Sequence, residues 1–546
     1  MNRYKTIFKK PNDDLLSLYL EHYNINIDDY DLNNLEDVNH YGNHNIELGH
    51  KFIEDCATTE KKAIVLVDVD CDGITSSCIV GKFLLQKGIT PLFIYHTNKI
   101  HGLDDEIAFN KITQSAVQLI IIPDASGQQH LFDTLTSIYN KKIICLDHHN
   151  NKVIPNEKLV VLNNKFNTKG NKDLSGAGVA WKFCQQSYNE LDDMDLVGLS
   201  VISDSCVASN ENRTFVRKLL HGPSNPFLIY CIKTMINKKD YNAIDLAFNV
   251  IPKINASIRM GDEILQGQIL TALMETTTNI ELFEEVARDM LKAHRAQSSF
   301  VSNKTNEIIK SYVSFDDAVG IVVANDLLNY TGLIANKLAS TYNKPFLVCS
   351  KDKQLLTGSA RSPIPFRELC EDSKLFEWNK GHSGAFGTCF QEKNTNDIIK
   401  YFNSHLSEQS ADYTVCDIVA DDEINKLQYI PYFQLHEQGY DYWCTNIQEP
   451  TFAINLNNIQ GKDWNELKGN TIKLQKNISY IMFRVPNYIK EQLQIGRFNK
   501  NQPYDLTLVG TLGYNCYNGK RYPQMIIKHI EVKESMDNKN SFDSIW

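Results

Sequence analysis

The sequence of 546 residues lacks several features that mark whole classes of protein. Its 13 cysteines form no C-x-x-C pair, which argues against zinc ribbons and thioredoxin-type chemistry and indicates a reducing compartment. Residues 1–16 lack the apolar core of a signal peptide, and no apolar run is long enough to span a bilayer. The phosphate-binding motif G-x-x-x-x-G-K-[ST] is missing, so the sequence does not support a nucleotide-driven helicase. We therefore expect a cytoplasmic protein that does not contact a membrane.

An excess of positive charge is also missing. Asp and Glu number 66 against 56 Lys and Arg, which gives a formal net charge of −10. This balance argues only weakly against a nucleic-acid enzyme, because a local basic groove can lie on an acidic body. The length is enough for three or four domains with sizeable apolar cores.

Apolar runs typical of buried strands alternate with helical segments in the first half of the chain. This alternation predicts an α/β domain over residues 61–225 with an open, mostly parallel sheet. Its expected strands are residues 63–68, 91–96, 118–123, 142–146 and 159–162. In such sheets, ligands bind beyond the carboxyl ends of the strands.

The rest of the chain is predicted to hold further domains. Apolar positions at helical spacing, without Pro or Gly, predict a long helix from about residue 280 to 312. A second α/β unit should follow, and strand-like runs that flank an Asn-Gly turn then predict a small β-barrel. The predicted boundaries are 1–60 for an N-terminal extension, 226–312 for a helical connector, 313–410 for the second α/β domain, 411–535 for the barrel and 536–546 for a polar tail.

The most informative segment is D-V-D-C-D-G, which places Asp68, Asp70 and Asp72 directly after the first predicted strand. A calcium-binding EF-hand loop begins with the same pattern. However, an EF-hand requires a preceding helix and a Glu at loop position twelve, where this chain has Ile79. Carboxylates this close repel each other, and a bound cation is the usual remedy. The segment therefore predicts a metal site at the end of a strand.

More candidate ligands follow predicted strands or a helical run. They are Asp124, Asp147, His148, His149 and Asp204. Each alone is typical of a helix cap, a turn or a surface position, but the expected sheet brings them to the edge that carries the first three carboxylates. Oxygen-rich ligation with an imidazole favours manganese or magnesium over zinc. So many carboxylates suit two cations that share one ligand, an arrangement that hydrolyses phosphate esters.

These residues resemble the motifs of the DHH phosphoesterase superfamily and, within it, of the RecJ-like single-strand-specific 5′→3′ exonucleases. Further matching segments are S-G-A-G-V at 175–179, E-N-R at 211–213, I-N-A-S-I-R-M at 254–260, G-S-A-R-S at 358–362 and G-H-S-G-A-F-G at 381–387. The motifs taken together indicate this family more specifically than any one of them does alone. The resemblance implies an α/β protein in which a parallel-sheet DHH domain is joined by a long helix to a second, DHH-associated α/β domain. A C-terminal β-barrel similar to an OB-fold would complete it.

The resemblance also implies roles for the matching residues at the metal site. Asp68, Asp70 and Asp124 would hold one divalent cation, and Asp72, Asp124, His148 and Asp204 would hold the other. Manganese is the expected metal, with magnesium as the alternative. In catalysis, Asp147 would orient an imidazole and His149 would contact the scissile phosphate.

A second set of residues would contact the nucleic acid. Ser359 and Arg361 would form a pocket for a terminal 5′-phosphate, because a guanidinium can bind phosphate through two hydrogen bonds. Gly381 and His382 would also touch the substrate, and Arg259 would contact its backbone.

One segment departs from the family pattern. Where the family usually has P-N-R after the second strand, this chain has T-N-K, ending at Lys99. A lysine supplies positive charge but lacks the planar guanidinium that can make two hydrogen bonds to one phosphate. Recognition of the 5′ end should therefore be looser here.

The predicted function is that of a metal-dependent enzyme that releases 5′-mononucleotides from the 5′ end of single-stranded nucleic acid, with DNA favoured over RNA. We expect a monomer that serves replication, recombination or repair and has a protein partner there. Tyr514, Tyr517 and Tyr522 are candidates for base stacking, although tyrosines at this spacing are more typical of barrel core or surface. The alternative is a DHH-type phosphodiesterase for short oligoribonucleotides or small phosphorylated nucleotides. A non-enzymatic scaffold would have lost its ligands, and this chain retains them.

Overall fold

A computed structural model describes most of the chain. The described residues are 4–8, 14–26, 46–96, 102–166, 170–185, 192–236, 238, 240–260, 263–311, 317–325, 327–406, 413–444, 447–495, 503–517 and 520–534. They form two compact units, which we call unit A (Asn26–Ser299 with Asp441–Gln448) and unit B (Met1–Ile25, Phe300–Tyr440 and Glu449–Trp546).

Unit A contains a five-stranded parallel sheet. Its strands are β2 (Lys62–Val67), β3 (Thr90–Tyr95), β4 (Leu119–Pro123), β5 (Lys142–Asp147) and β6 (Leu159–Asn163). They lie in the order β3-β2-β4-β5-β6, and every pair is parallel. All five strands lie where the sequence predicted them.

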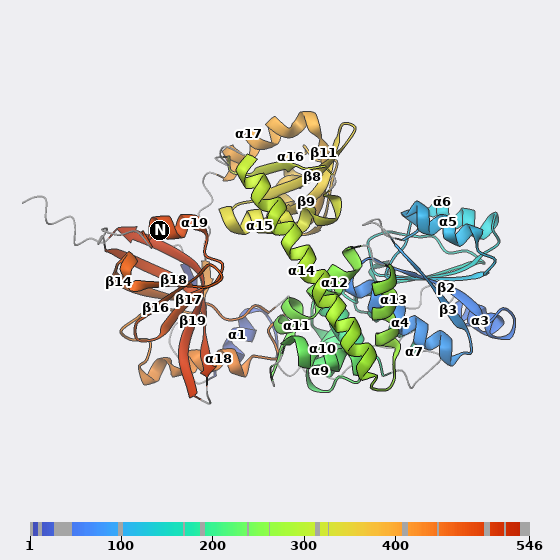
Figure 1. The fold of residues 1–546 in the computed structure, drawn as a ribbon, viewed down its shortest axis with the longest axis horizontal. Coiled ribbons are helices and arrows are strands. Elements are labelled where there is room, and N and C mark those ends of the chain that lie inside the picture. Colours follow the sequence, from blue (N-terminus) through green and yellow to red (C-terminus); the bar gives the residue numbers. More distant parts are fainter. Residues whose placement is uncertain are drawn as a thin grey trace, which may run out of the picture. The chain divides into compact units, whose positions relative to one another are not determined.

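Helices cover both faces of this sheet. On β2, Val65 belongs to one apolar cluster and Ile64 to another, and Ile121 and Ile120 of β4 divide in the same way. The helices on one side are α3 (Ile46–Thr58), α4 (Cys71–Gln86) and α7 (Gly176–Gln185); those on the other are α5 (Glu106–Gln114) and α6 (Gln129–Ser137) (Figure 1). Because helices cover both faces, the central strands β2, β4 and β5 are almost entirely apolar instead of alternating with polar residues.

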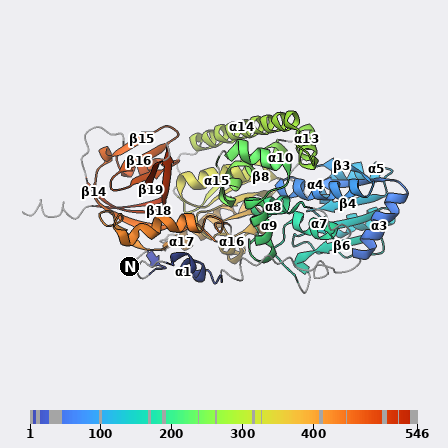
Figure 2. The same cartoon turned by 90° about the horizontal axis from the view of Figure 1, so that it is seen from below.

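A helical region completes unit A. It comprises α8 (Met194–Ser203), α9 (Asn210–His221), α10 (Pro226–Cys231), the π-helical turn η4 (Ile232–Ile236), α11 (Ala243–Asn249), α12 (Ile251–Arg259) and α13 (Glu263–Met274). The predicted long helix is confirmed as α14 (Ile280–Ser311). Its first part lies beside α10 and α13 (Figures 1 and 2). Phe283 of α14 packs there against Phe227 of α10.

Unit B begins with a mixed α/β region. Its sheet has the order β10 (Trp378–His382), β11 (Ala385–Gln391), β9 (Leu355–Arg361), β8 (Phe346–Asp352) and β7 (Gly320–Val323). The β7–β8 pair is parallel and the other pairs are antiparallel. Three helices accompany it, α15 (Thr331–Tyr342), α16 (Arg367–Ser373) and α17 (Thr395–Leu406).

The C-terminal part of unit B is rich in β-structure, as predicted. Its sheet has the order β13 (Ile418–Ala420), β14 (Phe452–Ile459), β18 (Tyr504–Tyr517), β19 (Lys520–Glu534), β17 (Ser479–Met482), β16 (Thr471–Gln475) and β15 (Trp464–Leu467). Helices α18 (Ile430–Gln438) and α19 (Asn487–Gln492) belong to the same part. The predicted Asn518-Gly519 turn lies outside the described residues, and closure into a barrel stays a prediction.

The predicted N-terminal extension is divided between the units. β1 (Tyr4–Thr6) pairs in parallel with β12 (Tyr413–Val415) in unit B, whereas α3 packs on the sheet of unit A. The domain boundaries drawn from the sequence therefore remain a proposal. Among the described residues, no helix combines the length and the apolar character that crossing a membrane requires.

Candidate active site

The candidate site lies at the point where the strand order of the parallel sheet reverses. From β2 the chain moves first to β3 on one side and later to β4 on the other, so the loops after β2 and β4 diverge. A crevice opens beyond such strand ends and binds ligands in open α/β sheets. Asp68 and Asp70 follow β2, and Asp124 follows β4.

Asp70 and Asp72 lie at the first turn of α4. Asp70 is the N-cap, and its side chain accepts hydrogen bonds from the backbone N–H groups of Asp72 and Gly73, at 3.1 Å each. Asp72 is fully buried and accepts the N–H groups of Gly176 and Ala177, at 2.7 Å each, together with the hydroxyl of Ser200. Both oxygens of Asp72 are thus engaged, and this carboxylate anchors the first turn of α7.

Asp124 has an unusual backbone conformation. Its φ is +59°, in the left-handed region that Asp and Asn tolerate better than other residues with a side chain. Gly176 lies so close that a Cβ atom there would be 2.2 Å from Asp124 Oδ1. The first glycine of the S-G-A-G-V motif is therefore explained by the space that the Asp124 carboxylate needs.

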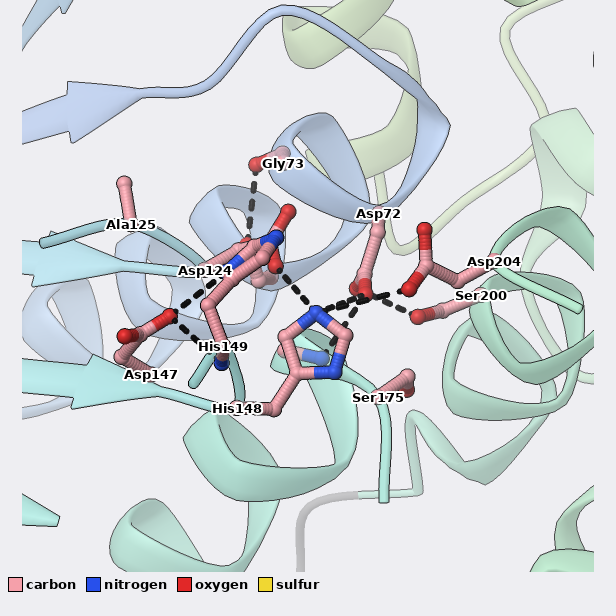
Figure 3. A network of polar contacts seen from close by, with 12 residues as sticks. Asp72, Gly73, Asp124, Ala125, Asp147, His148, His149, Ser175, Ser200 and Asp204 are labelled. Atoms are coloured by element: carbon pink, nitrogen blue, oxygen red, sulfur yellow. Dashed lines mark hydrogen bonds and ion pairs between the residues drawn. The ribbon is translucent and has the colours of Figure 1, made fainter. Parts of the chain in front are cut away.

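His148 faces three carboxylates (Figure 3). Its Nε2 is 3.1 Å from Asp124 Oδ1, 3.4 Å from Asp204 Oδ2 and 3.6 Å from Asp72 Oδ2. Its Nδ1 lies 3.1 Å from the carbonyl oxygen of Leu174, which favours the tautomer protonated at Nδ1. The lone pair on Nε2 then points at the carboxylate oxygens.

This arrangement fits a divalent cation. In the described part of the chain, His148 Nε2 and Asp124 Oδ1 are buried and make no hydrogen bond. A cation between a nitrogen lone pair and a carboxylate oxygen would satisfy both atoms. Possible ligand atoms within 4.8 Å of one another come from Asp68, Asp70 and Asp124 in one group, from Asp124, His148 and His149 in a second, and from His148, Asp204 and Cys206 in a third. The first group is the ligand set predicted for one cation.

The clustering of charge shifts the pKa values of these groups. Burial, followed by repulsion from Asp72 and Asp70, raises the pKa of Asp124 well above its usual value and that of Asp204 to about 8. Burial lowers the pKa of His148, although the charge of Asp72 opposes this shift. Carboxylates that resist ionisation without a counter-charge are the expected property of an oxygen-rich cation site.

His149 is held by Asp147, one of the predicted catalytic pairings. Its Nδ1 lies 2.8 Å from Asp147 Oδ1, and its backbone carbonyl accepts a hydrogen bond from Asn163. Burial would lower the pKa of His149, but the hydrogen bond and charge of Asp147 outweigh it and raise the pKa to about 9. The same hydrogen bond lowers the pKa of Asp147 against the effect of its burial. In the metal-free protein, the contacts with Asp147 therefore favour the imidazolium form of His149.

The sequence analysis assigned no role to two residues that contact this site, His96 and Asn255. His96 follows β3 and places Nδ1 3.3 Å from Asp68 Oδ1, while its Nε2 lies 3.0 Å from the carbonyl oxygen of Gly102. Its place at the end of a predicted strand was a usable signal. Asn255 of α12 accepts a hydrogen bond from the backbone N–H of Cys71 at 2.9 Å. This helix, far along the chain, therefore anchors the D-V-D-C-D-G segment. Asn255 belongs to the I-N-A-S-I-R-M segment that matched the family pattern, but the sequence did not indicate its contact with Cys71.

The predicted substrate residues lie in both units. Arg259 ends α12 in unit A; burial lowers its pKa, and the nearby charge of Asp70 opposes this shift. The others lie in unit B: Ser359 and Arg361 on β9, and Gly381 and His382 on β10. Lys99 lies outside the described residues.

Arg361 and Ser359 adjoin the N-terminus of α15. The hydroxyl of Ser359 lies 2.9 Å from that of Thr331, and Arg361 lines a cavity of about 840 Å³ within unit B. Gly332 also lines it, and a Cβ atom there would come within 2.9 Å of Arg361 Nη2. Of the residues that the structure describes, Arg484, Lys528 and His529 line the cavity as well, and no carboxylate does.

The fold and the site define the class of this domain. Residues 62–202 match the model of the DHH family, N-terminal domain. This part of the chain is a DHH domain, as the motifs predicted. Over 87% of its length the chain is 29% identical to the putative SPbeta prophage-derived single-strand DNA-specific exonuclease YorK of Bacillus subtilis, covering 88% of that protein.

Other relatives agree with this class. The single-stranded-DNA-specific exonuclease RecJ of Bacillus subtilis is 24% identical over 88% of this chain and 63% of its own. The crystal structure of RecJ from Thermus thermophilus in complex with Mn²⁺ matches with a TM-score of 0.71, over 98% of this chain and 80% of that one. Its Mg²⁺ complex matches with a TM-score of 0.66. At 16% and 15% sequence identity, these two structures establish the fold alone.

Proposed function

We propose that this protein is a metal-dependent exonuclease that hydrolyses single-stranded DNA from its 5′ end. The observation that carries the proposal is the convergence of Asp68, Asp70, Asp124, His148 and Asp204, from separate segments, at the crevice of the sheet. The two relatives named as single-strand-specific exonucleases supply the substrate class.

We propose that these five residues hold two divalent cations, with manganese as the first choice and magnesium as the alternative. When bound, the ions would stabilise charge on the phosphoryl oxygens. They would also lower the pKa of a water molecule, so that hydroxide is available to attack phosphorus. The two Thermus structures are complexes with these two metals. Asp72 was predicted as a further ligand, but its engaged oxygens favour a role in positioning α7.

His149 and Asp147 act on the substrate in this proposal. An imidazolium at His149 donates a hydrogen bond to a phosphoryl oxygen, and Asp147 holds the ring in the orientation that this contact requires. The same contact with Asp147 favours a hydrogen-bond donor at this position over a general base.

The terminal 5′-phosphate would be recognised in unit B. The guanidinium of Arg361, the hydroxyl of Ser359 and the N-terminus of α15 are all suited to an anion. Gly381 and His382 remain proposed substrate contacts, as does Arg259 in unit A.

A digestion experiment tests the proposal. The full-length protein is incubated with 5′-phosphorylated, end-labelled single strands of DNA or RNA, with duplex DNA and with a dinucleotide, each with Mn²⁺ or Mg²⁺. The expected result is release of 5′-mononucleotides from single-stranded DNA, and its loss in Asp124→Asn. Faster hydrolysis of the dinucleotide than of the long strand would instead support the alternative phosphodiesterase.

A further inference from the structure

The E-N-R motif is buried although all of its residues are polar. Glu211, Asn212 and Arg213 open α9 and are at most 2% exposed. Burying such groups is costly unless each finds a partner. Their partners therefore show what the motif does.

Glu211 connects α9 to α7. It forms an ion pair with Lys182 Nζ at 2.6 Å, and both side chains are buried. The first turn of α7 is the one that Asp72 anchors beside Asp124. The motif therefore supports the wall of the candidate site through α7.

Asn212 closes two loops beside the same site. Its side-chain amide donates hydrogen bonds to the carbonyl oxygens of Asp173 and Val207, at 2.8 Å each. The next residue after Asp173 is Leu174, whose carbonyl oxygen lies 3.1 Å from His148 Nδ1. Val207 lies three residues beyond Asp204. One side chain thus holds both the loop that orients His148 and the loop that carries Asp204.

Arg213 binds a short segment from far along the chain. We call residues 441–444 the strap. The guanidinium donates a hydrogen bond to the carbonyl oxygen of Asp441 and lies 4.6 Å from the ring centroid of Tyr442. Trp443 is fully buried, and Cys444 packs against the main apolar cluster of unit A. The Nε2 atom of His221, at the end of α9, lies 2.8 Å from Asp441 Oδ2.

The strap belongs to unit A, but the segments before and after it belong to unit B. The α18 helix precedes it and β14 follows it. The strap is therefore a short segment of unit A that the chain enters after α18 and leaves before β14.

We infer that the E-N-R motif couples the strap to the active-site loops. Arg213 holds the strap, and Asn212 is the positioning residue that keeps Asp204 and His148 in place. Because Asn212 and Arg213 are neighbours on one helix turn, release of the strap loosens both loops. This inference needs neither substrate nor metal, so it can fail while the proposed function stands.

Native cysteines provide the test. Cys444 lies in the strap, Cys206 lies in the loop that follows Asp204, and both are partly buried against the same apolar cluster. Exposed Cys516 in unit B is the internal reference. Alkylation rates of each thiol are measured in the metal-free full-length protein by peptide mapping. In Arg213→Ala, we expect Cys444 and Cys206 to react about tenfold faster, equivalent to about 1.4 kcal/mol, and Cys516 to react at the wild-type rate.

Two further variants sharpen this test. Lys218→Ala removes another cation of α9, whose ion pair with Asp192 does not involve the strap, and it should leave both rates unchanged. Arg213→Lys keeps a donor and should restore part of the protection. An unchanged Cys444 rate in Arg213→Ala would show that Arg213 does not hold the strap. Faster reaction of Cys444 with an unchanged Cys206 would disprove the coupling.

Other variants guard against loss of folding in Arg213→Ala. Tyr442→Leu removes the ring contact from the strap side and leaves α9 intact, so it should also expose both thiols. Asn212→Asp keeps an acceptor for Asn171 but loses both donated hydrogen bonds. It should accelerate Cys206 and leave Cys444 within about twofold of wild type. Acceleration of Cys444 alone would contradict the role given to Asn212.

Discussion

At the scale of single residues, the candidate site depends on carboxylates that the metal-free protein holds at a cost. Asp124 combines a left-handed backbone, burial and a raised pKa. The left-handed backbone costs energy whatever the charge of the side chain, and the raised pKa shows that burial and neighbouring carboxylates oppose its ionisation unless a counter-charge is present. Such concentrated strain at one residue is typical of a functional position.

Replacing Asp124 by Asn should separate stability from function. Asn tolerates the left-handed conformation and carries no charge, so the metal-free variant should melt at a higher temperature than wild type. Activity should fall by at least about 10³-fold, because a shared cation ligand is lost. Thermal denaturation with and without Mn²⁺ checks both effects. A variant that is still stabilised by Mn²⁺ to the wild-type extent would contradict the ligand role of Asp124.

Arg361→Ala should impair substrates according to their 5′ ends. Removing the hydrogen bonds between the guanidinium and a phosphate should lower kcat/KM on 5′-phosphorylated strands by about 10- to 100-fold. Strands with a 5′-hydroxyl should be nearly unaffected. Arg367→Ala, which removes a surface arginine paired with Glu368, is the matched control. Equal losses on both kinds of end would remove the phosphate pocket from the proposal.

At the scale of elements, the N-terminus of α7 shapes the site from two sides. It donates N–H groups to Asp72 and leaves room for Asp124 at Gly176. The helix therefore fixes how far apart the segments after β2 and β4 lie. The backbone conformation of Gly176 does not by itself require a glycine; the closeness of the Asp124 carboxylate does.

Gly176→Ala tests this spacing. The new Cβ would lie 2.2 Å from Asp124 Oδ1, so the carboxylate or the helix must move. A displacement near 1 Å can reduce catalysis by about 10²-fold, and we expect a loss of this size. Gly222→Ala, where a Cβ atom would meet nothing within 4 Å, is the control. Full activity in Gly176→Ala, measured by release of mononucleotides, would show that the close approach is unimportant.

At the scale of the whole molecule, protons and cations should compete for the same carboxylates. Asp204 has a pKa of about 8 in the folded metal-free protein, above the value of an exposed aspartate. Relative to the unfolded chain, the protonated form of Asp204 stabilises the fold fully only below the ordinary aspartate pKa of 3.8, and this stabilisation is lost as the pH rises from there to about 8. Binding of a cation must displace this proton.

The stabilisation by Mn²⁺ should accordingly increase with pH. We expect the rise in Tm on adding Mn²⁺ to be larger at about pH 8.5 than at about pH 6. Calorimetry at both values, in buffers of different ionisation enthalpy, would count the protons released. A rise in Tm that does not change with pH would argue that these carboxylates do not bind the metal.

Much of the site was predictable because parallel strands end at one edge. The alternation of strand and helix places the residues that follow β2, β4 and β5 together, whatever the details of packing. Asp68, Asp70, Asp124 and His148 were predicted in this way, and the structure brings their side chains together. His96 could have been found by the same rule, since it follows β3.

The sequence by itself determined the order of the elements, the parallel sheet and the carboxylates at its edge, because these depend on local patterns of apolar residues and on chain direction. The tertiary structure alone decided which carboxylate oxygens accept hydrogen bonds within the protein and which groups orient the imidazoles. It also decided that Arg213 meets Asp441, 228 residues away. Such contacts depend on how whole elements pack, and packing leaves no periodic pattern in the sequence.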